Sequence, residues 1–334
     1  MSLSRKALSL LLSVLLPLAP AYPQVTGKRE KAPARPSMRR VLDLPYAGQS
    51  RTEPGDRRTL DLYLPAETGR EPEAEAARGR LLPVLVMIHG GAWAFGRKRS
   101  LTVSGLKARY FTGRGFCFAS LGYRLTPEVR HPEHVRDVAA ALAFLHDHVV
   151  EYGGDPERIF VMGHSAGAHL AALVATDARR LGEYGKDLSI LKGVIVLDTA
   201  AFDLPVLLRD YKKAAWARNL YLRPFGRDER VQADASPIRH LAKGRRYPPF
   251  LIFHTGLRKD AKDMSEAFAR ALRAIGGVAT TIHAKPYSHG LVNSRIGVPG
   301  DPVTVWIDRF LDEVLRGRDG DLGRGLRSRR PSRR

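Results

Sequence analysis

Short, almost entirely apolar runs alternate with longer helical stretches through the middle of this 334-residue chain. Runs such as "LPVLVMIH", "RIFVMGH" and "PPFLIFH" have the length of strands and no polar face, which is typical of strands buried on both sides. Between them lie stretches with helical spacing, such as "HVRDVAAALAFLHDHVVEYG" and "DMSEAFARALRAIG". This order predicts an α/β fold with a mostly parallel central sheet and helices on both faces.

The alternating pattern predicts a single domain over residues 41–315, because no internal repeat or long linker divides that region. It opens with "RVLDLPY" and "TLDLYLP", which a turn-forming segment separates, and we expect these two strands to pair antiparallel. Residues 203–245 lack a regular pattern and carry scattered aromatic side chains. We interpret that segment as a partial lid over an active site.

The first 21 residues have the layout of a secretory signal peptide. Arg5 and Lys6 precede an apolar run over 7–16, and an A-x-A sequence at 19–21 offers a cleavage site. An apolar run of ten residues is too short to span a bilayer. The segment therefore predicts a secreted or periplasmic protein, and an uncleaved N-terminal membrane anchor is the alternative.

Much of the formal net charge of +21 is concentrated near the two ends of the chain. Residues 28–40 carry six basic residues and one acidic residue, and residues 316–334 carry eight arginines and two aspartates. Neither end has apolar periodicity, which predicts a disordered basic linker over 22–40 and a disordered Arg-rich tail over 316–334. Such ends attract anionic surfaces or polymers. No aromatic side chain interleaves the arginines of the tail, so we expect no specific nucleic acid partner.

The single cysteine, Cys117, excludes an intramolecular disulfide. It lies in the apolar run "GFCFASLGY", which predicts a buried strand residue rather than a reactive thiol. A domain of this size does not need disulfides for stability, so their absence is compatible with export.

The stretch "FVMGHSAGAHL" places Ser165 in a G-x-S-x-G motif between a strand-like run and a helix-favouring run. The motif alone is weak evidence, because glycine and serine are common in this chain. Its position between a strand and a helix is typical of a nucleophile elbow, a sharp turn that exposes the serine hydroxyl. The alternative is a small residue at a close packing contact.

Paired glycines follow another buried run, in the segment "HGGAW" at 89–93. Gly90 and Gly91 would let backbone N–H groups face a ligand, and Ala166 would add an N–H group at a helix N-terminus. Together they predict an oxyanion hole. Trp93 either borders the acyl pocket as a substrate-binding residue or anchors this loop.

A base and an acid follow the last two apolar runs. Asp260 and Asp263 come after "PPFLIFH", and His289 lies in "KPYSHG" after "VATTIHA". Serine, acid and histidine in that order form a catalytic triad in folds of this kind: the imidazole takes the serine proton, and the carboxylate orients the imidazole. We expect Asp260 to be the acid, because Asp263 begins a helical pattern in which it would serve as an N-cap.

The combined motifs resemble those of the α/β-hydrolase superfamily, and within it the esterases and lipases with an HGGxW motif. This group includes carboxylesterases, kynurenine formamidase-like enzymes and feruloyl or acetylxylan esterases. "GYRLTPEVRHPEHVRDVAAALAFL" and "YGGDPERIFVMGHSAGAHLAAL" are similar to the text of the family over about residues 40–315. The resemblance implies an α/β-hydrolase fold.

The resemblance also implies roles for single residues. Ser165 would be the nucleophile, His289 the base and Asp260 the acid. Gly90, Gly91 and Ala166 would form the oxyanion hole. It implies that His89 steadies its loop rather than acting as the base. The sequence departs from the family at one point, because many relatives read H-G-x-x-D after the seventh strand and this chain reads "HTGLRKDAKD". Asp263 therefore remains the alternative acid.

Several other polar residues have structural explanations. No HExxH motif is present, and the histidines on or near a charged helix are expected to be solvated or supporting rather than metal ligands: His131, His134, His146 and His148. We expect no metal ion and no other cofactor. His169 is interpreted as a packing residue, and Asp198 and Asp203, which flank the end of the sixth strand, as residues that shape the pocket.

These features predict a serine hydrolase that cleaves carboxylic esters through an acyl-enzyme, acting on a small-molecule or carbohydrate-linked ester. An amidase or arylformamidase with the same triad is the first alternative, since the elbow does not distinguish esters from amides. A non-catalytic hydrolase-like binding protein is the second alternative, and it predicts a broken triad.

Overall fold

The computed structural model describes residues 38–47, 56–66, 81–210, 215–256 and 258–317. The predicted signal peptide, residues 22–37 of the predicted linker and the tail beyond residue 317 lie outside these ranges. Within the described ranges, no helix is both long enough and apolar enough to cross a membrane.

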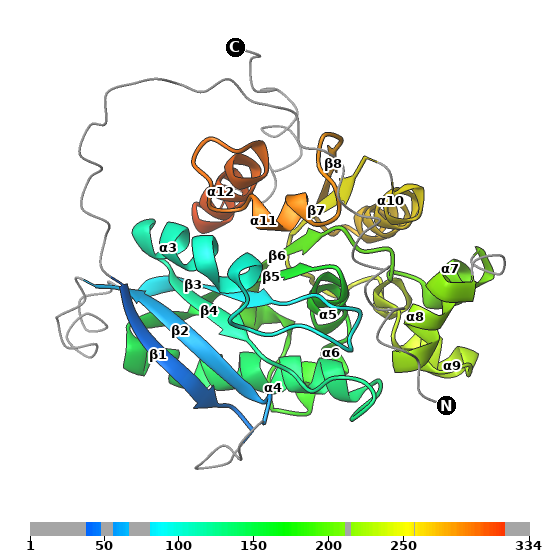
Figure 1. Ribbon diagram of the computed structural model, residues 1–334, viewed down its shortest axis with the longest axis horizontal. Coiled ribbons are helices and arrows are strands. Elements are labelled where there is room, and N and C mark those ends of the chain that lie inside the picture. Colours follow the sequence, from blue (N-terminus) through cyan, green and yellow to red (C-terminus); the bar gives the residue numbers. More distant parts are fainter. Residues whose placement is uncertain (1–37, 48–55, 67–80, 211–214, 257, 318–334) are drawn as a thin grey trace, which may run out of the picture. The chain divides into compact units, whose positions relative to one another are not determined.

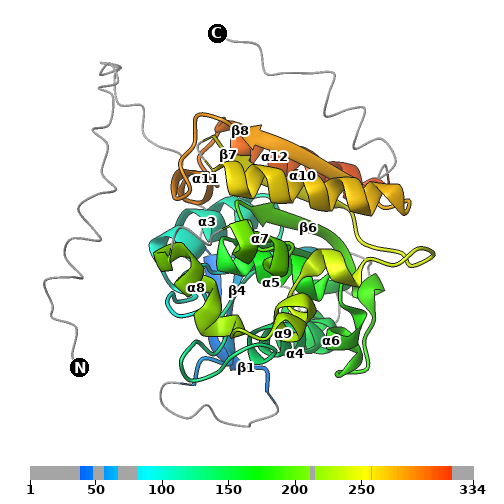
Figure 2. The ribbon, with the colours of Figure 1, turned by 90° about the vertical axis from the view of Figure 1, so that its right-hand side faces the viewer.

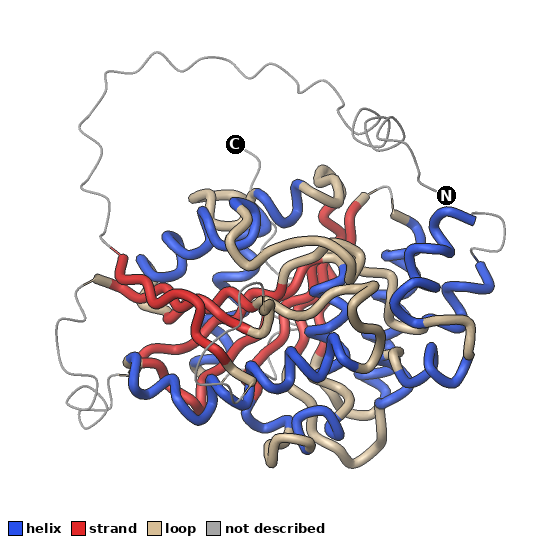
Figure 3. The backbone as a smooth tube through the Cα atoms, turned by 60° about the horizontal axis from the view of Figure 1, so that its bottom comes forward, coloured by secondary structure: helices blue, strands red, loops and turns tan. Residues whose placement is uncertain are grey.

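Eight strands form one sheet in the order β1-β2-β4-β3-β5-β6-β7-β8 (Figures 1 and 3). β1 and β2 pair antiparallel, β2 pairs antiparallel with β4, and all the other neighbours are parallel. The mostly parallel sheet predicted from the sequence is confirmed. The strands are β1 (Met38–Pro45), β2 (Thr59–Pro65), β3 (Leu82–Ile88), β4 (Cys117–Leu121), β5 (Gly154–His164), β6 (Leu191–Leu197), β7 (Phe250–Thr255) and β8 (Ala279–Ala284).

Helices cover both faces of the sheet (Figure 3). Because side chains alternate along a strand, Val86 packs into the core on one face and Leu85 and Met87 into the core on the other. The first core includes side chains of α4 (Glu133–His148), α5 (Ala166–Val174), α6 (Ala178–Gly182) and α10 (Lys259–Ala274). The second includes those of α3 (Leu106–Gly113), α11 (Leu291–Ser294) and α12 (Pro302–Leu315).

The segment predicted as an irregular lid contains three short helices, which lie together in two views (Figures 1 and 2). They are α7 (Leu204–Asp210), α8 (Ala215–Phe225) and α9 (Glu229–Asp234). Shorter turns of helix connect other elements: the π-helical η1 (Leu101–Gly105) and the 3-10 helices η2 (Val149–Tyr152), η3 (Leu188–Ile190) and η5 (Pro237–His240).

The sheet begins earlier than the sequence predicted. Residues 38–40 were assigned to the linker over 22–40, but they form the start of β1 and pair with residues 63–65 of β2. β1 is an edge strand with mostly exposed side chains, so its charged residues give no apolar pattern in the sequence. At the other end, α12 stops at Leu315. Cys117 is fully buried in β4, as predicted.

Candidate active site

Ser165 occupies a sharp turn between β5 and α5. Its backbone has φ 55° and ψ −116°, a conformation that L-residues rarely adopt, and its N–H donates to the carbonyl of Leu197 at 2.9 Å. Strained backbone of this kind is often found at functional sites, where the surrounding structure must hold it in place. The local geometry is therefore that of a nucleophile elbow.

Both glycines of the motif are required by close backbone contacts around the turn. A Cβ atom on Gly163 would lie 2.1 Å from the carbonyl oxygen of Gly167, and a Cβ atom on Gly167 would lie 2.2 Å from that of Ile88. No side chain fits at either distance. The G-x-S-x-G pattern thus follows from how tightly α5 packs against β3 and β5.

Three backbone N–H groups, two in the loop after β3 and one at the start of α5, have no partner within the described residues. Within the described ranges, no hydrogen bond is donated by the N–H of Gly90, Gly91 or Ala166. Ala166 is the first residue of α5, so its N–H points out of the helix N-terminus. Ala166 is buried, and Gly90 and Gly91 are half-buried. Free donors of this kind next to a serine on a sharp turn are the arrangement expected of an oxyanion hole.

The loop that carries the two glycines presses directly against the elbow. A Cβ atom on Gly90 would lie 2.8 Å from the carbonyl oxygen of His164 and 3.2 Å from Cβ of Ser165. Gly91 has φ 115°, and Ala92 and Trp93 also have positive φ angles of 51° and 57°. This run of left-handed residues turns the loop tightly where it meets the elbow.

His289 is hydrogen-bonded to Asp198, which directly follows β6. Nδ1 of His289 donates to Oδ2 of Asp198 at 2.6 Å, and Asp198 is fully buried while the His289 side chain is 39% exposed. Burial alone would raise the pKa of Asp198, but the hydrogen bond from His289 and the charge of Arg258 lower this pKa to about 2. Asp198 is therefore ionised at neutral pH and fixes the tautomer of His289.

Two further groups hold the Asp198 carboxylate in place. The backbone N–H of Thr255 donates to Oδ1 at 3.1 Å, and the hydroxyl of Thr255 donates to Oδ2 at 3.0 Å. Thr255 ends β7, so the acid on β6 is supported by the neighbouring strand. A carboxylate with several donors around it stays ionised and keeps its orientation.

The assignment of Asp260 as the partner of His289 is corrected by this geometry. Asp260 lies in the first turn of α10 and accepts a hydrogen bond from Nη2 of Arg258 at 2.9 Å. Asp263 does not cap the helix either, because α10 already begins at Lys259, with which Asp263 forms an i, i+4 ion pair. Of the three aspartates, only Asp198 contacts His289 within the described residues.

Arg258 lies between the two carboxylates. Its Nη1 is 3.4 Å from Oδ2 of Asp198 and 3.2 Å from Nδ1 of His289, while its Nη2 donates to Asp260. Burial would lower the pKa of Arg258, but the charges of Asp198 and Asp260 raise it. The guanidinium therefore stays charged beside the imidazole. Arg258 is the fifth residue of "HTGLR", the position at which the H-G-x-x-D pattern has its aspartate.

His164, the residue before the nucleophile, supports the loop that carries His289. Its Nε2 donates to the backbone oxygen of His289 at 2.7 Å, and the two rings lie 4.6 Å apart between centroids. Burial lowers the pKa of His164 to about 3, so this imidazole is neutral and adds no charge to the site at neutral pH. The sequence analysis assigned no role to this residue.

Trp93 anchors its loop and does not line an open pocket. Its side chain is only 4% exposed and packs against the rings of Tyr221 and Phe225 in α8. Its Nε1 donates to Nδ1 of His169 at 3.2 Å, and Nε2 of His169 donates to the carbonyl of Ala235 at 2.7 Å. Of the two roles predicted for Trp93, the structure places it in the anchoring one, and His169 links the oxyanion loop to the segment after α9.

The remaining histidines have partners that explain their positions. Nδ1 of His89 bonds the carbonyl of Gly90 at 2.8 Å, and the ring of His89 stacks on Tyr123 at 4.4 Å. Burial lowers the pKa of His89 to about 4, so the ring is neutral, as a loop-steadying residue would be. Among the four helix histidines, His131 bonds Asp234 at 2.8 Å, His134 bonds Thr126 at 3.2 Å, His146 bonds Asp147 at 3.3 Å, and His148 bonds Glu151 at 2.8 Å.

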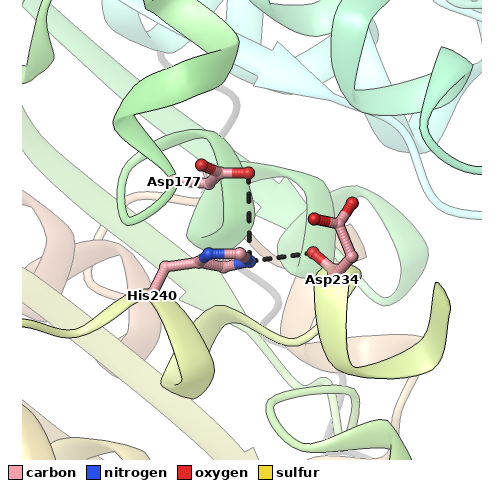
Figure 4. Close-up of side chains that lie close together, drawn as sticks. All are labelled: Asp177, Asp234 and His240. Atoms are coloured by element: carbon pink, nitrogen blue, oxygen red, sulfur yellow. Dashed lines mark hydrogen bonds and ion pairs between the residues drawn. The ribbon is translucent and has the colours of Figure 1, made fainter. Parts of the chain in front are cut away.

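A second polar cluster joins α6, α9 and η5, where Asp177, Asp234 and His240 lie close together (Figure 4). Nε2 of His240 donates to the backbone oxygen of Asp234 at 2.8 Å. The two carboxylates are already balanced by cations, because Arg179 bonds both and Arg180 contacts both. Ion pairing between the two helices explains this cluster without a bound metal.

The acid is not found among the residues that follow the seventh strand, where the sequence pattern predicts it. Asp198 follows the apolar run "LKGVIVL" directly, as Ser165 closely follows "RIFVM" on the neighbouring strand. Carboxyl ends of adjacent parallel strands meet at one edge of a sheet, so this adjacency was readable as a signal. The arginine at position 258, where the H-G-x-x-D pattern has its aspartate, was a second signal that the acid lies elsewhere.

Comparisons with known proteins agree with the fold. The BD-FAE family model matches residues 60–261. Esterase LipQ of Mycobacterium tuberculosis is 29% identical over 88% of this chain and 70% of its own length. Esterase LipC of the same organism is 32% identical over 71% of this chain and 59% of its own length.

This chain covers a smaller part of a relative from a plant. The probable isoprenylcysteine alpha-carbonyl methylesterase ICMEL1 of Arabidopsis thaliana is 27% identical over 82% of this chain, which spans 57% of that protein. Among solved structures, esterase B of Lactobacillus rhamnosis superposes with a TM-score of 0.67 at 22% identity, covering 87% of this chain and 90% of that one. The butyrate-bound esterase 2 of Thermogutta terrifontis superposes with a TM-score of 0.62 at 24% identity, covering 82% and 94%.

The fold and the site define an α/β-hydrolase of the esterase and lipase type, as the resemblance in sequence implied. Within that superfamily, the chain belongs to the BD-FAE family.

Proposed function

We propose that this protein is a serine esterase that cleaves carboxylic esters through an acyl-enzyme formed on Ser165. The observation that carries the proposal is that the N–H groups of Gly90, Gly91 and Ala166 have no partner among the described residues, while Gly90 packs against the strained Ser165 and Ala166 follows it. Free donors at this place stabilise the oxyanion that develops when a hydroxyl attacks an ester carbonyl. Esterases among the relatives support the same reaction class.

The reaction proceeds in two halves. His289 takes the proton of the Ser165 hydroxyl as the oxygen attacks the ester carbonyl, and the imidazolium then protonates the leaving alcohol. A water molecule next attacks the acyl-enzyme, and His289 again accepts and returns the proton. Ser165 and His289 are not hydrogen-bonded to each other in the structure; in unliganded sites such contacts are often long, and they tighten when substrate binds.

Asp198 takes the role of the acid. Because its carboxylate accepts from Nδ1 of His289, Nε2 is left free to face Ser165. The negative charge also stabilises the imidazolium that forms in each half of the reaction. Arg258 counteracts part of that charge, while keeping Asp198 oriented and ionised.

We expect the substrate to be a small-molecule ester, with a carbohydrate-linked ester as the alternative. Relatives named as esterases and as a methylesterase support an ester substrate. An amide or a formamide would reach the same nucleophile and oxyanion hole. The ester is favoured because an alcohol leaves the tetrahedral intermediate more readily than an amine.

The test is a panel of substrates with a matched inactive variant. We expect hydrolysis of p-nitrophenyl acyl esters, and comparison with acetyl sugars, feruloyl sugars and N-formylkynurenine separates the alternatives. Ser165→Ala should lower kcat by a factor of about 10⁴ or more while the protein stays folded. Turnover of N-formylkynurenine alone would establish the formamidase alternative, and turnover by Ser165→Ala would exclude Ser165 as the nucleophile.

We also propose that the protein is exported and cleaved after residue 21, which lies outside the described residues. The order of basic residues, apolar run and A-x-A sequence supports this proposal. Mass spectrometry of exported protein should find an N-terminus near residue 22. An intact Met1 would support the membrane-anchor alternative.

A further inference from the structure

A groove of about 590 Å³ lies between β1, η1 and α3. Three leucines on its walls are exposed to solvent: Leu42 is 46% exposed, Leu101 is 87% exposed and Leu106 is 48% exposed. Single exposed leucines are common on protein surfaces, but three on adjoining elements around one groove form an apolar patch of the kind that marks an interaction site.

The same groove is strongly basic. Arg40, Arg99 and Arg109 line it, and no aspartate or glutamate is among the lining residues. Arg99 is paired with Asp43 and Asp61. By contrast, neither Arg40 nor Arg109 forms an ion pair with any residue in the described part of the chain. Two exposed cations without counter-charges remain available to an anionic partner.

Each element presents a leucine together with an arginine. Arg40 and Leu42 are two residues apart on β1, and side chains at that spacing share a face of a strand. Leu106 and Arg109 are three residues apart on α3, and side chains at that spacing share a face of a helix. Both pairs point into the one groove, so apolar and cationic groups alternate across it. Figure 1 shows β1 and α3 at the left of the molecule and α7 to α9 at the right.

We propose that this face, defined by Arg40, Leu42, Leu101, Leu106 and Arg109 and here called the β1–α3 surface, docks on an anionic lipid bilayer. Lipid phosphates would pair with the two arginines, and the leucines would enter the boundary between headgroups and acyl chains. Basic and apolar groups in combination are the chemistry that binds such a boundary.

The sequence that leads into β1 favours a bilayer over a protein partner. Residues 28–40 carry a net charge of +5 without an apolar pattern, and in the sequence they lead up to and include Arg40 of β1. Basic residues spread along a stretch of chain can all be attracted to a laterally extended anionic surface. Each cation near that surface contributes about 1 kcal/mol of binding free energy, or roughly fivefold in affinity. A compact protein epitope would offer no counterpart to that whole stretch.

The β1–α3 surface is also joined to the active-site loop. Ser294 lines the groove and ends α11, which begins two residues after His289. The buried Nζ of Lys107 donates to the carbonyls of Thr102 in η1 at 2.6 Å and Asn293 in α11 at 2.7 Å. Docking would therefore bring the bilayer beside the loop that carries His289.

Vesicle co-sedimentation of the full chain tests the proposal. Vesicles of phosphatidylcholine with phosphatidylglycerol should bind the protein, and Arg40→Glu/Arg109→Glu should weaken that binding at least about tenfold. The control Lys243→Glu/Arg246→Glu changes the net charge equally at exposed residues of the loop before β7, and it should weaken binding less than about threefold. Equal losses in both variants would mean that only overall charge matters and would overturn the proposal.

The contribution of the leucines to vesicle binding is tested at high salt, where salt ions screen the interactions between surface charges that are more than about 4 Å apart. There Leu101→Ser/Leu106→Ser should lower the remaining binding at least about fivefold. The control Tyr184→Ser/Leu220→Ser removes two other side chains, each 40% exposed, and should leave the remaining binding unchanged. Equal binding by the two variants would exclude insertion of the leucines.

A local probe separates this surface from the basic ends of the chain. The native Cys117 is buried, so Leu101→Cys can be labelled at a single position with an environment-sensitive fluorophore, and Tyr184→Cys gives the control label. We expect a blue shift at position 101, and none at position 184, when anionic vesicles are added. Vesicle binding without a shift at 101 would assign the binding to the ends and overturn the proposal. These tests measure binding rather than hydrolysis, so either result leaves the proposed esterase activity to be judged separately.

Discussion

His289 donates from Nδ1 to Oδ2 of Asp198 at 2.6 Å, across 91 residues of sequence. The bond places the acid of the site at the end of β6, beside the strand that carries Ser165, and not after β7. Arg258 stands at the position after β7 where the sequence pattern of relatives has an aspartate, and it contacts the carboxylate on β6. His289 is therefore bonded to an acid after β6, while a cation follows β7.

Asp198→Asn should lower kcat by a factor of about 10²–10⁴, because the imidazole would lose its orienting charge and its preferred tautomer. Asp260→Asn should lower kcat less than about threefold, since Asp260 accepts a hydrogen bond from Arg258, whereas Asp198 is the carboxylate bonded to His289. Steady-state kinetics of both variants on one p-nitrophenyl ester measures the difference. Comparable losses in the two variants, or a larger loss in Asp260→Asn, would show that the acid is not Asp198.

Arg258→Gln should destabilise the fold in a pH-dependent way. The pKa of Asp198 is lowered to about 2, and Arg258 is among the causes after the opposing effect of burial and the hydrogen bond from His289. A carboxyl whose pKa is lower in the folded state than in the unfolded state stabilises the fold when the pH is above the unfolded-state pKa of about 3.9. This stabilisation is lost as the pH falls through the folded-state pKa. The variant should therefore be about 2 kcal/mol less stable at neutral pH, and the gap should shrink toward pH 2.

Urea denaturation at pH 7 and at pH 3 measures this gap. Arg230→Gln is the control, because Arg230 is an exposed arginine on α9, and its substitution should change stability by less than about 0.5 kcal/mol. A gap for Arg258→Gln that stays constant or widens between pH 7 and pH 3 would contradict the ion pair as its source.

Gly90→Ala should impair catalysis more than stability. The added methyl group would lie 3.2 Å from Cβ of Ser165 and 2.8 Å from the carbonyl oxygen of His164, so the loop must move away from the elbow. Displacing one oxyanion donor costs a factor of about 10²–10³ in kcat. Gly113→Ala is the matched control, because nothing lies within 4 Å of the added methyl group there, and kcat should not change. Full activity of Gly90→Ala would remove Gly90 from the oxyanion hole.

The sequence was sufficient for the fold because the strands of this sheet are buried on both faces. Their apolar runs stand out against amphipathic helices such as α10, and their order fixes a mostly parallel sheet. The first residues of β1 were predicted as part of the linker, because an exposed edge strand with charged residues resembles a linker in sequence. The segment of α7 to α9 shows no regular pattern because α7 and α9 have only seven and six residues, and α8 contains Pro224.

The site was predictable where the local backbone imposes the sequence. Gly163 and Gly167 are required by contacts too close for any side chain, so the elbow leaves a mark that survives without a structure. An acid leaves a weaker mark, because several aspartates follow strands and tertiary packing selects among them. Asp198 is chosen by burial, by the donors of Thr255 and by the reach of His289 across the sheet edge.

The most direct test of the Ser165–His289–Asp198 relay is the site and rate of covalent modification by a p-nitrophenyl phosphonate. Attack of the serine oxygen on phosphorus releases p-nitrophenolate and leaves a stable tetrahedral adduct, whose position peptide mass spectrometry can map. We predict one adduct, on Ser165, forming at least about 100-fold more slowly in Asp198→Asn and within about threefold of the native rate in Asp260→Asn. An adduct on another residue, or slow labelling of Asp260→Asn together with normal labelling of Asp198→Asn, would contradict this account of the site.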